Sequence, residues 1–307
     1  MKKQDLASSN YNYYPNAMIN LCVISYAEDI NDIPAQVAAM GLQVVWGPAQ
    51  WVDEFGVSYS LMYVAMNPAT GEYTVVIRGT NPTSLATWLD QDFDVAFTQP
   101  FKLLVPSAPS NALISQGTYN GMNDLISLTD PVTNELLTTF LGNLNPRTLY
   151  VTGHSLGGTL VPTMELYLNS FLYGGGYLHN MASWSFAGLA SGNVAFANYY
   201  NSLSNPEFPW RIHNPLDIAP FCFWSESSLQ NIYNSYGLPW SSLDFILRGI
   251  VDGLFLVASP NNYAQPVGDQ VLPAQFNTGE SGWAEQAFYQ HHATTYQALV
   301  ALQYPIS

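Results

Sequence analysis

The chain has 307 residues, enough to bury one large hydrophobic core, and we expect a single domain over 1–307. Charged residues make up only 9% of it against 14% aromatic, and 7 Lys+Arg against 22 Asp+Glu give a formal charge of −15. This acidic balance argues against nucleic acid or an anionic membrane surface as partner and favours a neutral, largely apolar substrate.

The N-terminus begins Met-Lys-Lys and continues with mostly polar residues, without the apolar run of about seven residues that a secretory signal peptide needs. No apolar run reaches the length of a membrane span, so we expect no stable membrane insertion. The expected location is the cytoplasm, with signal-independent secretion as the alternative.

Helical and strand patterns alternate along most of the chain. Apolar spacing predicts helices at 11–26 and 32–41, and period-two alternation predicts a hairpin from strands 58–66 and 72–78. Further segments with helical spacing are 85–91, 119–128, 135–141, 159–173, 194–200 and 291–303. Further segments with strand character are the stretch that begins at 149, 183–186, 210–214, 262–267 and 270–272. The alternation predicts an α/β fold with a central, mostly parallel sheet flanked by helices.

The segment 149–158 carries the strongest candidate for chemistry. An apolar strand leads into a tight turn with Ser155 at its apex, and Gly153 and Gly157 flank the serine at the G-x-S-x-G spacing. A β-carbon at either glycine would collide with backbone in the strained strand-to-helix turn of this motif. The helix that follows directs its N-terminal N–H groups at a developing oxyanion. The spacing by itself also fits an ordinary glycine-rich turn, but the strand before it and the helix after it favour a nucleophile.

A serine nucleophile needs a base, usually histidine. The chain has five histidines, His154, His179, His213, His291 and His292. We expect the first to point away from the serine, and the next two follow a glycine linker and lie in a strand, where a structural role is favoured. The last two, at the start of the final predicted helix, remain as candidates for the base. Either gives the order Ser, Asp, His along the chain that α/β-hydrolases have.

The acid that orients the base is expected at Asp217. This residue lies just beyond the predicted strand 210–214, at the end of a strand where α/β sheets keep their active sites. The alternative is a turn aspartate held between Pro215 and Pro220.

The segment 221–264 interrupts the alternation with an aromatic-rich insertion. The capping-box spacing of Ser241 and Asp244 predicts a helix at 241–258 that is apolar almost all round. Such a helix is typical of a buried core, and the alternative is a cap or the wall of an acyl-chain cleft.

Cys22 and Cys222 belong to no metal-binding motif, and we expect two buried thiols, with a disulfide between them as the alternative.

The chain resembles the class 3 lipases, α/β-hydrolases that include fungal triacylglycerol lipases, over about 61–302. The resemblance rests on motifs in a fixed order: Val-Ile-Arg-Gly-Thr at 76–80, Trp88 and Asp92, Gly-His-Ser-Leu-Gly-Gly at 153–158, Gly188 with 192–197, Asn214 to Pro220, and His291 with Tyr296.

The resemblance implies roles for individual residues. Ser155 is then the nucleophile, Asp217 the orienting acid and His291 the base, preferred to His292 because Tyr296 follows it at the family's spacing. The oxyanion hole is implied at the backbone N–H groups of Thr80 and Leu156, assisted by the Thr80 hydroxyl. A lid is implied at 81–95, with a set of apolar side chains that would cover a cleft. These are Leu85, Trp88, Leu89 and Phe93.

The leading hypothesis is therefore a serine carboxylester hydrolase, a lipase that cleaves acylglycerols through an acyl-enzyme and needs no cofactor or metal. Its partner would be a lipid or other small ester, met in transient contact with a lipid–water interface. Alternatives are a phospholipase A1, an esterase for soluble esters, and, from a different class, a non-catalytic lipid-binding protein.

Overall fold

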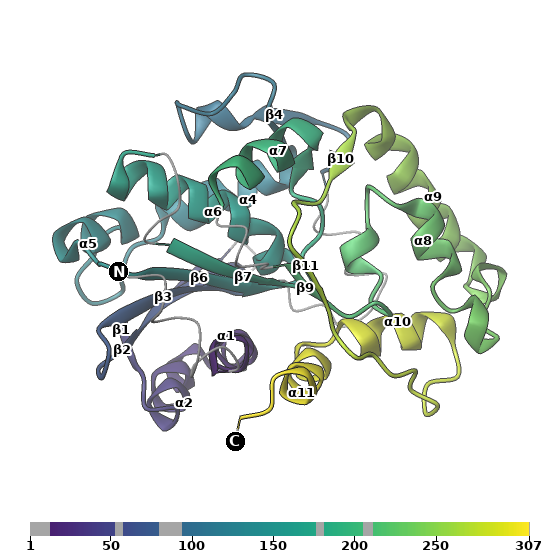
Figure 1. The fold of residues 1–307 in the computed structure, drawn as a ribbon, viewed down its shortest axis with the longest axis horizontal. Helices are drawn as coiled ribbons and strands as arrows, with labels where there is room; N and C mark the ends of the chain where they lie inside the picture. The colour runs from purple at the N-terminus through teal and green to yellow at the C-terminus, as the bar shows by residue number, and fades with distance from the viewer. Residues whose placement is uncertain (1–12, 53–57, 80–93, 176–180, 205–210, 307) are drawn as a thin grey trace.

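The computed structural model describes residues 13–52, 58–79, 94–175, 181–204 and 211–306. In this part of the chain, seven strands form a central sheet in the order β1-β2-β3-β6-β7-β9-β11 (Figure 1). Their bounds are β1 Gln43–Val52, β2 Ser58–Asn67, β3 Glu72–Ile77, β6 Leu149–His154, β7 Met181–Phe186, β9 Arg211–His213 and β11 Asp269–Val271. The pairs β1–β2 and β2–β3 are antiparallel and the remaining pairs are parallel. The predicted α/β class with a mostly parallel sheet is confirmed.

The hairpin of β2 and β3 has the period-two pattern that the sequence predicts. Met62 and Val64 point into one core cluster while Leu61 and Tyr63 point into the other, because successive side chains of a strand face opposite sides of the sheet. The neighbouring strand β1 was not predicted. Its sequence contains Gly47 and Pro48, and its pairing with β2 is irregular at this point, so the alternation is broken. A proline is tolerated there because β1 lies at the edge of the sheet.

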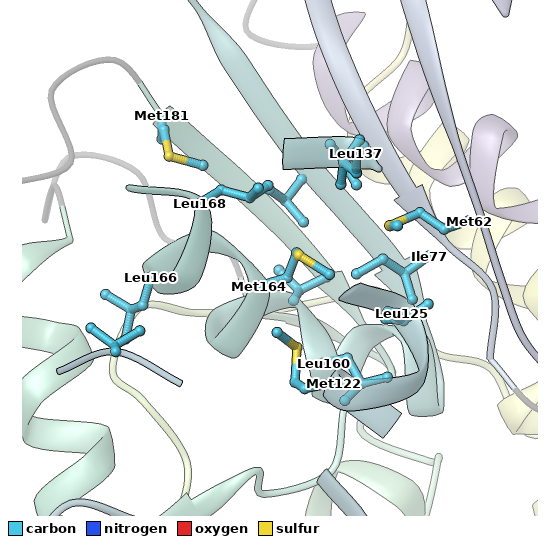
Figure 2. Packing of buried hydrophobic residues seen from close by; sticks show 14 of the residues in the cluster. Met62, Ile77, Met122, Leu125, Leu137, Leu160, Met164, Leu166, Leu168 and Met181 are labelled. Carbon is cyan, nitrogen blue, oxygen red and sulfur yellow. The ribbon is translucent and has the colours of Figure 1, made fainter. Parts of the chain in front are cut away.

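Helices cover both faces of the sheet (Figure 1). One face packs against α1 (Tyr13–Ile24), α2 (Ile33–Ala39) and α11 (Ala293–Gln303). The other packs against α4 (Gln116–Ser127), α5 (Leu137–Leu144), α6 (Leu156–Tyr173) and α7 (Val194–Leu203). Figure 2 shows this second core, in which Met122, Leu160 and Met164 fill the space beneath Met62 and Ile77.

The helix α6 starts at Leu156, directly after the serine, three residues earlier than predicted. It contains Pro162, which has no N–H to donate to the carbonyl of Gly158. The Ser185 hydroxyl donates to that carbonyl instead, at 2.8 Å. This hydrogen bond ties the first turns of α6 to strand β7.

A second, antiparallel sheet of four short strands occurs among the described residues, in the order β10-β8-β5-β4. Its strands are β10 Tyr263–Ala264, β8 Gly192–Asn193, β5 Leu113–Ser115 and β4 Thr98–Pro100. The predicted strand 262–267 is thus shortened to β10. The predicted strand 270–272 is displaced by one residue and forms β11 of the central sheet. The four-stranded sheet was not predicted, because strands of two or three residues carry no readable alternation.

The insertion 221–264 forms a lobe that contains α8 (Glu226–Asn231) and α9 (Phe245–Ala258). The predicted capping box is wrong: Ser241 lies in a short 3₁₀ helix, and the Asp244 carboxylate caps α9 itself by accepting from the N–H groups of Ile246 and Leu247. The expectation of a buried core helix is also wrong. Only one face of α9 is buried, and Phe245 and Leu256 are 72% and 76% exposed.

The helix predicted at 291–303 corresponds to α11, which starts two residues later, and the helix before it, α10 (Trp283–His291), was not predicted. His292 separates them with an extended backbone, so His291 ends α10 and does not start the last helix.

Cys22 and Cys222 are both buried and free, which confirms two thiols and not a disulfide. The predicted helix 85–91 lies outside the described residues.

Candidate active site

Ser155 sits in a strained turn between β6 and α6. Its φ of 61° and ψ of −126° are rare for a residue with a side chain, and its N–H donates to the Phe186 carbonyl at 3.0 Å. A β-carbon at Gly153 would lie 2.5 Å from the Gly157 carbonyl carbon, and one at Gly157 would overlap the Ile77 carbonyl oxygen. The glycines of the motif are therefore required by close backbone approach.

The structure brings together the three side chains that the sequence singles out for the triad. Ser155 Oγ lies 2.7 Å from Nε2 of His291, and Nδ1 of that histidine lies 2.9 Å from Oδ2 of Asp217. The three groups come from the end of β6, the end of α10 and the turn after β9, all at the carboxyl end of the parallel strands. Ser155 and Asp217 are fully or almost fully buried, and His291 is 8% exposed. In this arrangement a proton can pass from the serine to the imidazole while the carboxylate holds the other ring nitrogen.

Asp217 is buried but well supplied with donors. The Tyr296 hydroxyl donates to Oδ2 at 2.7 Å, and the Ala219 N–H donates to Oδ1 at 3.0 Å. Such donors offset the cost of burying a carboxylate away from water. The sequence reasoning used Tyr296 only as a spacing marker and missed this hydrogen bond. The spacing of Tyr296 from His291 was the signal that could have identified it.

The strand end and the histidine-bearing helix are also linked directly. The side-chain amide of Asn214 donates to both the carbonyl and the side-chain oxygen of Gln290, at 3.0 and 2.7 Å. Gln290 in turn donates to the Gln275 carbonyl at 2.9 Å. Because Asn214 and Gln290 lie three and one residues from Asp217 and His291, this link sets the separation of acid and base.

The other histidines near the site differ in setting. His154 points away from the serine, as expected, and its Nδ1 lies 3.0 Å from the Tyr26 hydroxyl. Its ring lies 5.1 Å from that of His291. Burial lowers the pKa of His154 well below its usual value, and the charge of His291 lowers it further, so His154 stays neutral.

His292 is exposed, with Nδ1 near the Thr294 hydroxyl at 3.2 Å. His213 pairs with Asp269 at 2.6 Å, and His179 lies outside the described residues.

A cavity of about 270 Å³ opens onto Ser155 and His291. Its walls come from the end of α1 and from the junction of α10 and α11, and they combine apolar and polar side chains. They include Val23, Tyr26, Glu28, Phe288, His292 and Ala293. Among the described residues, none from the insertion 221–264 lines this cavity, so the expectation that α9 forms an acyl-chain wall is not supported.

The oxyanion hole and the lid were predicted partly outside the described residues. Leu156 is the first residue of α6, next to the serine, so its N–H is one of the unpaired donors of a helix N-terminus. Thr80, Leu85, Trp88, Leu89 and Phe93 are not described.

Within the described ranges, no group of His, Cys, Asp or Glu side chains could hold a metal ion, and no helix is long and apolar enough to cross a bilayer.

Comparison with known proteins identifies the family. The family model for class 3 lipases matches residues 74–226. The crystal structure of M37 lipase is 25% identical and superposes with a TM-score of 0.76, over 96% of this chain and 94% of that one. The chain belongs to the class 3 lipase family. As a class 3 lipase, it is a carboxylic ester hydrolase with the α/β-hydrolase fold.

More distant lipase structures share the fold. Lip2 lipase from Yarrowia lipolytica is 18% identical with a TM-score of 0.57, over 94% of this chain and 89% of that one. The triacylglyceride lipase of Rhizomucor miehei is 22% identical with a TM-score of 0.53, over 70% of this chain and 75% of that one. No curated protein matched the sequence in a similarity search.

Proposed function

We propose that this class 3 lipase hydrolyses acylglycerol esters, with Ser155 as nucleophile, His291 as base and Asp217 as orienting acid. The observation that carries the proposal is the chain of contacts from Ser155 Oγ through His291 to Asp217, at 2.7 and 2.9 Å. These distances are those at which a hydroxyl, an imidazole and a carboxylate share hydrogen bonds.

The reaction follows from the order of these contacts. Ser155 Oγ attacks the ester carbonyl carbon while Nε2 of His291 accepts its proton, and Asp217 stabilises the imidazolium that forms. The tetrahedral intermediate expels the alcohol, which takes that proton from His291, and leaves an acyl-Ser155 ester. A water then gives a proton to His291 and attacks the acyl carbon, and His291 passes that proton to Ser155 Oγ as the bond to the acyl group breaks and the carboxylic acid leaves. We propose the N–H groups of Leu156 and Thr80 as the oxyanion donors.

The substrate class is supported by the comparisons and by the site. One related structure, 23% identical, is that of a triacylglycerol lipase whose catalytic centre is formed by a serine protease triad. The formal charge of −15 favours an uncharged ester, and Val23, Phe288 and Ala293 give the cavity an apolar part. A volume of about 270 Å³ holds a part of an acylglycerol, so the rest of such a substrate would extend out of the cavity. The molecule would therefore meet its substrate at a lipid–water interface.

The decisive experiment compares the wild type with Ser155→Ala on emulsified triacylglycerol, on phospholipid and on soluble p-nitrophenyl esters. We expect the wild type to release fatty acid from the triacylglycerol and the variant to lose at least about three orders of magnitude in rate. Rapid hydrolysis of phospholipid in place of triacylglycerol would replace the proposal by a phospholipase A1. Near wild-type hydrolysis by folded Ser155→Ala would overturn the assignment of the nucleophile.

A further inference from the structure

The helix α9 presents an apolar face to solvent. Phe245, Ile246, Leu256 and Val257 are 72%, 59%, 76% and 42% exposed. At 100° per residue, these side chains and the glycines at 249 and 253 fall on one side of the helix. We call this set, Phe245, Ile246, Gly249, Gly253, Leu256 and Val257, the α9 stripe. Contiguous exposed apolar surface of this kind marks an interaction site in a soluble protein.

The α9 stripe cannot turn inward, because the opposite face of the helix is fixed. Val251, Phe255 and Ala258 are buried in the core cluster of the lobe, together with Tyr233 and Trp283. The Tyr233 hydroxyl also donates to the Leu216 carbonyl at 2.6 Å, next to Asp217. The stripe is thus held rigidly by a lobe that is tied to the candidate active site.

Other exposed apolar residues lie near the C-terminal end of α9. The Asn261 side chain donates to the carbonyls of Val95 and Ala96, and the Val194 N–H donates to the Asn262 carbonyl. These contacts bring Phe97, 67% exposed, and Val194, 49% exposed, close to the end of the helix. Two further exposed apolar side chains thus lie beyond the C-terminal end of α9.

The charges beside the α9 stripe, and the charge of the whole chain, indicate which kind of partner binds the stripe. One edge of α9 carries Asp244, Arg248 and Asp252, a nearly balanced set, whereas the whole chain has a formal charge of −15. An anionic lipid surface would repel such a chain, and so would a second copy of it. A second copy is further disfavoured because a single 14-residue helix offers less than the roughly 800 Å² per partner of a stable protein interface.

We propose that the α9 stripe docks onto the surface of an uncharged lipid aggregate, the phase that holds the water-insoluble ester. The inference rests on the proposed function, which supplies such a phase as substrate. Phe245, Ile246, Leu256 and Val257 would enter the lipid while the polar edge stays in water, as in a helix that lies at an interface. Docking is then a separate step from chemistry at Ser155.

Binding is tested in a Ser155→Ala background, so that the lipid is not consumed. Flotation with a triolein emulsion compares this protein with one that also carries Phe245→Ser and Leu256→Ser. The matched control carries Phe171→Ser and Leu302→Ser, which remove the same residue types at sites 56% and 63% exposed on α6 and α11. We expect the α9 pair to lower the partition into the emulsion by at least about tenfold and the control pair to leave it nearly unchanged. Equal effects of both pairs would overturn the proposal.

Activity separates this inference from the proposed function. With Ser155 restored, the α9 pair should hydrolyse dissolved p-nitrophenyl butyrate like the wild type and emulsified triolein at least about tenfold more slowly. A wild type that hydrolyses neither ester would contradict the proposed function, whereas the flotation result would still decide the docking. An equal loss of both activities would contradict docking by the stripe.

Gly249 distinguishes lipid from a second copy. A β-carbon at this position meets no atom within 4 Å, so Gly249→Leu adds apolar surface to the stripe without a clash inside the chain. If the stripe lies on lipid, this variant should float with triolein at least as well as its parent. If instead the parent sediments as a dimer and Gly249→Leu dissociates it without raising emulsion binding, the stripe pairs with a second copy and the lipid proposal is wrong.

Discussion

The Tyr296 hydroxyl donates to Oδ2 of Asp217 at 2.7 Å, the same oxygen that Nδ1 of His291 contacts at 2.9 Å. Burial raises the pKa of Tyr296 well above its usual value, and the negative charge of Asp217 raises it further, so the hydroxyl remains a donor throughout the working pH range. The Asp217 carboxylate, which orients the base, is thus held by Tyr296 as well as by its contact with His291.

Tyr296→Phe should weaken both the fold and the site. Loss of a hydrogen bond to a buried charge costs about 1.5–3 kcal/mol in the free energy of unfolding. A carboxylate held less firmly should lower kcat/KM by about tenfold, with KM little changed. The control is Tyr63→Phe, which loses a neutral hydrogen bond to the Leu21 carbonyl at 2.7 Å on the same side of the sheet. Equal kcat/KM in both variants would show that Tyr296 is only structural.

The adjacent histidines should differ sharply. His291→Ala removes the base that contacts Ser155 and should lower kcat/KM for a soluble ester by about three orders of magnitude or more. His292→Ala removes an exposed ring whose hydrogen-bonding contact is with Thr294, and should change the rate by about threefold at most. The reverse order would make His292 the base.

Glu165 should make stability depend on pH near neutrality. Burial in α6 raises its pKa from 4.5 to about 7, although the Tyr200 hydroxyl donates to it at 2.6 Å. The folded protein therefore keeps a proton that the unfolded chain releases between about pH 4.5 and 7. The contribution of this group to the free energy of unfolding is fully present below that window and is lost as the pH rises through it.

Glu165→Gln should remove this loss. Its urea midpoint should be close to that of the wild type at pH 4.5 and higher at pH 8, by an amount equivalent to about 2–3 kcal/mol. Comparison of the two proteins at each pH cancels the effect of the large net charge. A constant difference between them from pH 4.5 to 8 would show that Glu165 does not titrate in this range.

Substitution of glycine by alanine should have opposite effects at two positions. Gly249 lies in an exposed part of α9 with open space around it, so Gly249→Ala should raise the free energy of unfolding by about 0.5–1 kcal/mol. Gly157 faces the Ile77 carbonyl at the candidate nucleophile turn, and Gly157→Ala should lower it by about 2 kcal/mol or more. Chemical unfolding of both variants checks the pair, and a stabilised Gly157→Ala would contradict the close packing of the turn.

The sequence predicts most reliably what is encoded locally. The turn around Ser155 can be read directly because G-x-S-x-G stands between an apolar strand and a helix. The hairpin of β2 and β3 can be read because alternation and turn residues agree. Asp217 could be proposed as the acid because it follows a strand, and the structure brings it next to His291.

What the sequence does not reveal depends on tertiary contacts. The break between α10 and α11 occurs at His292, without the glycine or proline that usually marks a helix end, so the start of the last helix was predicted two residues early, at 291. The exposure of the α9 stripe could not be predicted, because a helix that is apolar on nearly all sides gives no sign of which face is covered. The small sheet of β4, β5, β8 and β10 arises from pairing between distant segments.

Labelling of the two buried thiols can report on partial unfolding of the protein. Burial raises the pKa of Cys22 to about 12 and also raises the pKa of Cys222, so neither thiol reacts readily with a thiol reagent in the folded state. Cys22 lies in α1 against the central sheet, whereas Cys222 lies in the core of the lobe that carries α9. The order in which a maleimide labels them during slow denaturation therefore tells whether the lobe detaches before the sheet loses its covering helices.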